Sequence, residues 1–269
     1  MQNGYYQAAG AMVTQFNRLD VTTNNLANVN TSGYKKDDVV IGDFERLYRE
    51  ARERMPLANQ TKKAAKFINR TLDRVPHIVE RTIDFTPANV RHTGNPLDLA
   101  LQGGDLFFAV DTPNGVRLTQ QSSFTLDHEG TIVTKEGYRL LPADFMRSNE
   151  RKITLPENAT ILIDPEGNIK NGDQPVGQIF IGRVDNLKAL KKEGDNLLTM
   201  ENLAENLTQM EKGNFVKQEY MTLSNVNAVK EMTSLIEINR LVEIYQKIMT
   251  SHMDDLNRDA ITKLATPRA

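Results

Sequence analysis

Apolar residues recur with helical spacing near the N-terminal end of the 269-residue chain. Alternating separations of four and three residues predict an amphipathic helix from about residue 3 to residue 28. The predicted seam of this helix consists of Tyr5, Ala9, Met12, Phe16, Leu19, Thr23 and Leu26. Polar residues flank this narrow stripe, so the helix buries too little surface to remain folded without a partner helix.

A second apolar pattern, without Pro or Gly, predicts a longer helix from about residue 225 to residue 265. Its apolar positions form three neighbouring rows: Leu235, Val242, Met249 and Leu256; Ile238 and Tyr245; Leu241 and Ile248. The apolar surface therefore reaches well round the helix, and one antiparallel partner would leave part of it uncovered. A larger bundle or neighbouring subunits must cover the remainder.

Between the helices, from about Val75 to Gly182, the chain consists of short apolar or alternating runs. Clusters of Asp, Asn, Pro and Gly separate these runs and supply the backbone geometry of tight turns. The turn signals begin at Asp111, Asp127, Lys135, Asp164 and Lys170. This pattern predicts an all-β domain rich in hairpins.

These elements predict an α+β fold with long terminal helices and an inserted β domain. We expect residues 1–35 and 222–269 to form a helical coiled-coil or bundle domain for polymerisation, and residues 76–182 to form the β domain. Residues 36–75 and 183–221 are expected to connect them. The first connection holds a basic stretch, Glu45 to Arg74, for which a solvated linker, a charged helix and a subunit contact all remain open.

Composition excludes several classes of function. The formal net charge of -2 provides no field that would attract nucleic acid or an anionic membrane. The absence of cysteine excludes disulfides, thiolate catalysis and cysteine zinc sites. No apolar run reaches the roughly 18 to 20 residues of a membrane helix, and the N-terminus lacks the early basic residues of a secretory signal. We therefore expect a cytoplasmic chain or one exported without a cleavable signal peptide.

Motifs for catalysis or cofactor binding are not found. The four histidines stand far apart in the sequence, without the spacing of metal ligands. No phosphate-binding glycine loop, nucleophile elbow or pair of catalytic carboxylates occurs. The sequence therefore predicts a protein that is not an enzyme and has no catalytic, cofactor or metal site.

The tripeptide Asn-Val-Asn occurs twice, at residues 28–30 and 225–227. The first copy follows the predicted N-terminal helix, where Gly33 suits a left-handed backbone. The second precedes the predicted C-terminal helix, where Ser224, Asn225 or Asn227 can cap the first free amides. If the helices pair antiparallel, both copies lie at the same end of the pair.

Both regions resemble hallmarks of bacterial flagellar rod and hook proteins. The N-terminal resemblance consists of Asn24, Asn25, Leu26, Ala27, Asn28, Val29, Asn30, Thr31, Ser32, Gly33, Tyr34 and Lys35. The C-terminal resemblance consists of Ser224, Asn225, Val226 and Asn227. Residues 96–103 are similar to the start of the family's β domain. Residues 119–124 depart from the family, which often has Arg and Gly there.

The resemblance implies a structural subunit of the flagellar basal-body rod, most like the proximal rod subunit, with the distal rod protein as the alternative. Its implied partners are copies of itself, neighbouring proximal and distal rod subunits, and the flagellar type III export apparatus, and its implied location is the periplasmic rod. A ligand- or glycan-binding β module with helical oligomerisation ends is an alternative of another class.

Two residue sets are expected to serve assembly. The family motif supplies Asn24, Asn25, Leu26, Ala27, Asn28, Asn30, Thr31, Gly33, Tyr34, Ser224, Asn225, Val226 and Asn227. The helix-packing seams supply Tyr5, Met12, Phe16, Leu19, Leu235, Ile238, Val242, Tyr245, Met249 and Leu256. On this view, substitution of Asn28 or Gly33 disturbs assembly more than it disturbs the fold of the β domain.

Overall fold

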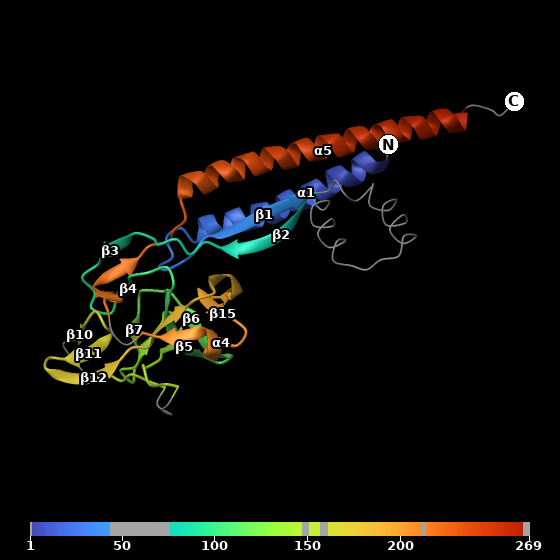
Figure 1. Ribbon diagram of the computed structural model, residues 1–269. Helices are drawn as coiled ribbons and strands as arrows, with labels where there is room; N and C mark the ends of the chain where they lie inside the picture. Colours follow the sequence, from blue (N-terminus) through green and yellow to red (C-terminus); the bar gives the residue numbers. More distant parts are fainter. Residues whose placement is uncertain (1, 44–75, 147–150, 157–160, 211–212, 266–269) are drawn as a thin grey trace, which may run out of the picture. The chain divides into compact units, whose positions relative to one another are not determined.

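The computed structural model describes residues 2–43, 76–146, 151–156, 161–210 and 213–265. The chain divides into two compact units (Figure 1). Unit 1 comprises residues 1–26, 37–82 and 227–269, and unit 2 comprises residues 27–36 and 83–226. Helices and strands together make an α+β fold. The basic stretch from Glu45 to Arg74 lies outside the described residues.

Unit 1 contains both predicted helices, which are confirmed with ends within a few residues of expectation. Helix α1 spans Gln2–Ala27 and helix α5 spans Ala228–Ala265, and the two run in opposite directions (Figure 1). Strand β1 (Asp37–Asp43) pairs with strand β2 (Pro76–Ile83), whose last residue belongs to unit 2. No helix of the described residues is both long and apolar enough to cross a membrane.

Helix α1 buries a face other than its predicted apolar seam. The buried positions recur at helical spacing and are mostly small or polar: Ala8, Ala11, Thr14, Gln15, Val21, Thr22 and Asn25. The predicted seam is half-buried at Tyr5, Met12 and Leu19, and Phe16 is 41% exposed. Small residues allow another segment to approach the helix closely, whereas larger apolar side chains would hold it further away. The seam therefore keeps apolar surface available to other molecules.

In helix α5 the predicted seam coincides with the least exposed line of the helix. Ile238 and Val242 are buried, and Leu235, Tyr245 and Met249 are half-buried. The side chain of Leu256 lies outside those described. This line is continuous over four turns of α5.

Unit 2 is built from short strands, most of them joined by tight turns. From residue 90 to residue 140 the strands are β3 (Val90–His92), β4 (Leu99–Leu101), β5 (Leu106–Thr112), β6 (Gly115–Thr119), β7 (Thr125–Leu126), β8 (Ile132–Val133) and β9 (Arg139–Leu140). From residue 161 onwards they are β10 (Ile161–Ile163), β11 (Asn168–Asn171), β12 (Gln174–Gln178), β13 (Ile181–Val184), β14 (Lys191–Gly194), β15 (Leu197–Thr199), β16 (Leu207–Gln209), β17 (Val216–Gln218) and β18 (Tyr220–Thr222). A 3-10 helix, η1 (Leu187–Ala189), and a short helix, α4 (Leu203–Asn206), complete the unit.

The predicted turn signals coincide with antiparallel hairpins. They connect β5 to β6, β7 to β8, β8 to β9, β10 to β11, and β11 to β12. The largest sheet has the order β14-β15-β6-β5-β9-β8-β7, with β13 pairing to both β5 and β16. Strands β10 to β12 form a separate three-stranded sheet. The hairpin-rich character of this region is therefore as the turn residues indicated.

Strand β5 is the centre of the hydrophobic core. Its side chains alternate between two clusters, with Phe108 and Val110 in one and Phe107 and Ala109 in the other. All four are fully buried, as expected for a strand covered on both faces. Strand β5 therefore contributes side chains to both hydrophobic clusters of unit 2.

The expected connecting segment at residues 183–221 requires correction. It forms strands β14 to β18, and β15, β16 and β17 pair with β6, β13 and β4 in unit 2. Strand β2, which was expected in the β domain, lies largely in unit 1, where it pairs with β1. Residues 183–221 are polar in composition, and their strands have only three or four residues. Such strands are too short for an alternation of apolar and polar residues to be recognised.

Candidate assembly site

Asn25 of the family motif lies near the end of helix α1, inside unit 1. Its side chain is 1% exposed and bonds both main-chain groups of Asp37. The carboxamide donates to the Asp37 carbonyl at 2.8 Å and accepts from the Asp37 amide at 2.9 Å. This two-way pairing mimics a strand ladder and fixes the start of β1 against the end of α1.

After helix α1 the chain turns through residues 27–36, which we call the signature loop. The Thr31 amide donates to the Asn28 carbonyl at 3.2 Å, and the Thr31 hydroxyl donates to the Asn28 side-chain oxygen at 3.1 Å. Gly33 has φ +69°, the left-handed geometry expected for it. A Cβ on Gly33 would lie 2.0 Å from the Gln120 carbonyl oxygen. The structure therefore opposes the expectation that substitution of Gly33 spares unit 2.

The second half of the signature loop is buried although it is polar. Ser32, Tyr34 and Lys35 are each less than 9% exposed. Distant parts of unit 2 supply their hydrogen bonds. The Asn196 side chain donates to the Ser32 carbonyl at 3.2 Å, and the Lys192 ammonium donates to the Lys35 carbonyl at 2.6 Å while lying 4.0 Å from the Tyr34 ring centre. Without such partners, burial of these groups would be strongly unfavourable.

Lys35 carries a buried ammonium group. It donates to the Thr86 carbonyl at 3.0 Å. Burial lowers the pKa of Lys35 from its ordinary value of 10.5 to about 8, and the Asp84 carboxylate opposes this shift. The charged form therefore costs free energy in the folded chain at neutral pH.

Asn225 from the second Asn-Val-Asn copy connects three segments of unit 2. Its side-chain oxygen accepts from the Lys36 amide at 2.7 Å, and its side-chain nitrogen donates to the Asp84 carbonyl at 2.8 Å and to the Thr86 hydroxyl at 3.3 Å. Its main-chain amide donates to the Tyr34 carbonyl at 3.4 Å. Asn225 thus fastens the signature loop rather than capping a helix.

Asn227 is the residue that caps helix α5. Its side-chain oxygen accepts from the Lys230 amide at 3.1 Å, three residues into the helix, which is the standard N-cap bond. Ser224 instead accepts from the Val226 amide at 3.2 Å. Of the three cap candidates, Asn227 was therefore correct, and Ser224 and Asn225 were wrong because the helix begins later, at Ala228.

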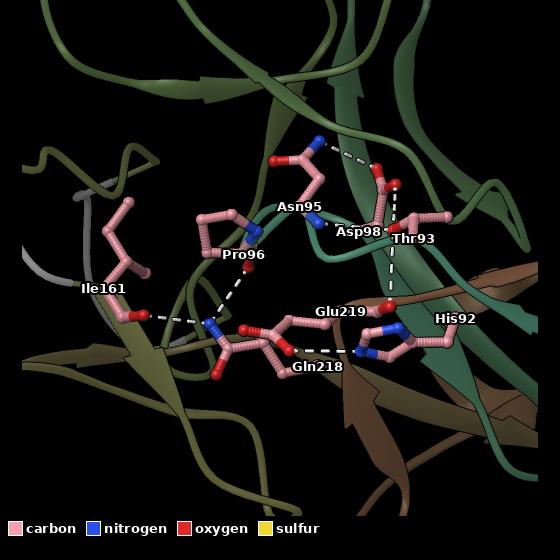
Figure 2. Close-up of polar contacts among 8 residues, drawn as sticks. All are labelled: His92, Thr93, Asn95, Pro96, Asp98, Ile161, Gln218 and Glu219. Carbon is pink, nitrogen blue, oxygen red and sulfur yellow. Dashed lines mark hydrogen bonds and ion pairs between the residues drawn. The ribbon is translucent and has the colours of Figure 1, made fainter.

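A polar network fixes the strands that lead to Asn225 (Figure 2). The Gln218 side-chain nitrogen donates to the carbonyls of Pro96 at 3.0 Å and Ile161 at 2.9 Å. Glu219 has φ +66°, and its carbonyl accepts from the Thr93 amide at 2.8 Å. The left-handed Glu219 lets the chain leave β17, which pairs with β4, and continue as β18, which pairs with β3. The network therefore sets the path of residues 222–225.

Helix α5 leaves large apolar side chains exposed. Val229, Met232, Ile236 and Ile244 recur at spacings of three, four and eight residues and so share one face. That face lies opposite Ile238 and Val242, which are buried. Ile236 is 52% exposed and Val229 is 73% exposed. Exposed charged residues such as Arg240 and Glu243 lie between these side chains, so the face offers separate apolar side chains that a partner could cover.

Sequence reasoning missed the partners of the signature loop. Gln120, Thr222, Asn196 and Lys192 all contact it, yet none carries a local pattern that predicts this. Asn225 was singled out as part of the family motif and as a helix cap, and its bonds to the signature loop were not predicted.

Comparisons with known protein families match three parts of this geometry. A family described as flagella basal body rod protein matches residues 6–35, which cover most of α1 and the signature loop. The D1 domain of flagellar hook protein FlgE/F/G matches residues 101–171. The C-terminal region of flagellar basal body rod FlgEFG protein matches residues 217–262, from β17 into α5.

Similar proteins cover nearly the whole chain. The flagellar basal-body rod protein FlgF of Caulobacter vibrioides is 29% identical, over 98% of both chains. The rod protein FlgG of Bacillus subtilis is 31% identical, over 93% of this chain and 95% of its own. FlgG of Agrobacterium fabrum is 30% identical, over 91% and 93%. The chain belongs to the flagellar basal-body rod protein family.

The resemblance drawn from the two motifs is therefore confirmed. The rod family consists of structural subunits of the flagellar basal body, which assemble with other rod and hook components, and not of enzymes. Both Asn-Val-Asn copies fall inside or beside segments that the family defines. Within unit 2, Asn225 and the signature loop join those segments by direct hydrogen bonds.

Proposed function

We propose that this protein is a subunit of the proximal rod, in which copies of the chain polymerise through their terminal helices. In this proposal α1 and α5 form a helical polymerisation domain, with coiled-coil packing along their seams, and unit 2 is the inserted β domain. The subunits line a hollow shaft that transmits torque and conducts exported proteins. The chain reaches the periplasmic rod through the type III export apparatus.

The observation that carries this proposal is the apolar face of α5 opposite its buried face. A fully buried isoleucine contributes roughly 1.5–3 kcal/mol, so the exposed half of Ile236 offers about 1 kcal/mol to a neighbour. Repetition over Val229, Met232 and Ile244 gives several kcal/mol for each copy, which is sufficient for a helical array in which every subunit contacts several others. The half-exposed seam of α1 adds to this surface.

The exchange Ile236→Asp tests this surface without touching the core. Because Ile236 is already half exposed, we expect the purified chain to keep its helical content. Incorporation into basal bodies and swimming in soft agar should be lost. Gln246→Asp adds the same charge on the same helix without removing apolar surface, and it should retain both. Normal incorporation of the Ile236 variant would refute this use of the α5 face.

The level within the rod needs a different experiment. Residues 96–102 and 224–229 favour the proximal rod, and the distal rod is the alternative in the same family. Electron microscopy of basal bodies from a strain lacking this protein should show rods that stop at the membrane-proximal end. Rods that are complete up to their distal part would assign the chain to the distal rod. Deletion of residues 1–30 should abolish assembly, whereas a glycan-binding β module would keep its ligand affinity.

A further inference from the structure

The signature loop depends on hydrogen-bond partners that lie far towards the C-terminus in the sequence. Its Lys36 amide bonds to Asn225, 189 residues further on, and its Ser32 carbonyl accepts from Asn196, 164 residues further on. The Gly33 amide donates to the Thr222 carbonyl at 3.0 Å. Two further bonds of the loop go to Asp84 and Thr86: the Asp84 amide donates to the Lys36 carbonyl at 2.9 Å, and the Lys35 ammonium donates to the Thr86 carbonyl at 3.0 Å. Asn225 also bonds to both of these residues.

Residues Thr222–Asn225, which we call the C-terminal clamp, are themselves anchored on the unit 2 core. The Thr222 amide donates to the Ser122 hydroxyl at 2.8 Å, and both residues are buried. The Ser122 carbonyl accepts from the Leu99 amide at 2.7 Å, next to the core strands. The clamp can therefore take its place once the core has folded, before the signature loop is bound.

The reverse order is unfavourable. Without the clamp, the Gly33 amide loses its bond to Thr222. The Lys36 amide and the Tyr34 carbonyl lose their bonds to Asn225, although the loop remains polar. Ordering the loop would then cost conformational entropy and leave buried polar groups unsatisfied. A loop in this condition should stay open to solvent.

We propose that the signature loop is a closure device that completes unit 2 only after the C-terminal clamp has docked. Because a polypeptide is synthesised from its N-terminus, residues 27–36 cannot form these hydrogen bonds until residues 222–225 have been made. A chain that lacks residues 222–225 therefore cannot complete unit 2. This inference rests on contacts within unit 2 and stands independently of the rod level.

Hydrogen exchange during refolding of the full chain tests this order. After dilution from denaturant, pulse labelling should show the Phe108 and Val110 amides protected first and then the Thr222 amide, which bonds to Ser122 in the core. The Gly33 and Lys36 amides should be protected at the same time as Thr222 or later. Protection of the Gly33 and Lys36 amides before that of Thr222 would overturn the proposal.

The variant Asn225→Asp provides a second, native-state test. The new carboxylate can still accept a hydrogen bond from the Lys36 amide. It cannot donate to the Asp84 carbonyl and is instead repelled by that oxygen. The hydrogen-exchange rates of the Gly33 and Lys36 amides should therefore rise about tenfold or more. In both chains, unaltered and variant, the Gly33 and Lys36 amides should exchange faster than the Phe108 amide, because the loop opens without the core. Asn227→Asp makes the same chemical change two residues away and keeps the α5 cap, so the loop should remain protected. Unchanged exchange in the loop of the Asn225 variant, or loop amides that exchange only as slowly as Phe108, would contradict a separate closing step.

Discussion

Replacement of Gly33 by alanine should destabilise unit 2 through two separable causes. Its φ of +69° is a left-handed geometry that costs a residue with a Cβ about 1–2 kcal/mol. The added Cβ would also lie 2.0 Å from the Gln120 carbonyl oxygen and 2.7 Å from the Gln121 amide nitrogen. These neighbours are backbone atoms, so relief requires a backbone shift that adds about 1–3 kcal/mol. We therefore expect a total loss of about 2–5 kcal/mol.

Gly94 provides the matched control. It has φ +75°, and no atom lies within 4 Å of the position that a Cβ would take. Gly94→Ala should therefore show the conformational cost alone, about 1–2 kcal/mol. Both glycines belong to unit 2, so the difference between the two variants isolates the contact with Gln120.

Native-state hydrogen exchange at the Phe108 and Val110 amides, measured across a urea series, gives the free energy of opening of unit 2. Gly33→Ala should lower this free energy by at least about 1 kcal/mol more than Gly94→Ala does. Equal losses in the two variants would refute the close packing of the signature loop on Gln120. They would restore the expectation that Gly33 serves assembly without supporting the fold.

Three further changes have smaller or more local effects. Asn227→Ala should destabilise the first turn of α5 by about 1 kcal/mol, seen as faster exchange of the Lys230 amide, which loses its acceptor. Burial lowers the pKa of Lys35 from 10.5 to about 8, so between these two pH values the unfolded chain binds more protons than the folded chain. The free energy of unfolding should therefore rise with pH in this window, by about 3 kcal/mol in total. The variant Lys35→Met should lose that increment in urea unfolding. Gln218→Ala should expose the Ile163 amide, which donates to it at 2.9 Å, to faster exchange.

The parts of the fold that sequence predicted are those with a local physical cause. Helix α5 was found because its inner face, with Ile238 and Val242, repeats at helical spacing. The hairpins were found because Asn-Gly and Pro-Asn-Gly turns require backbone geometries that few other residues adopt. The rod family was found because motifs at both ends agreed. Each of these signals is contained in a few neighbouring residues.

The parts that sequence missed depend on partners that are distant along the chain. The buried face of α1, with Ala8 and Ala11, carries no strong apolar period, so the larger side chains of the other face were taken as the packing seam. Residues 183–221 were taken as a connection because each of their strands offers only three or four positions. The bonds from Asn196 and Asn225 to the signature loop span more than 160 residues and leave no local pattern.

Residues 119–124, which depart from the pattern of the rod family, are also held by contacts with distant parts of the chain. The family often has Arg and Gly here, and their absence put the local turn in doubt. The structure instead holds this segment with the Gln120 side chain, whose amide donates to the carbonyls of Gly104 at 3.0 Å and Leu106 at 2.8 Å. With its side chain fixed by two bonds, Gln120 presents a rigid carbonyl to Gly33. Gly33 packs against this carbonyl, and its position in the signature loop leaves no room for a Cβ.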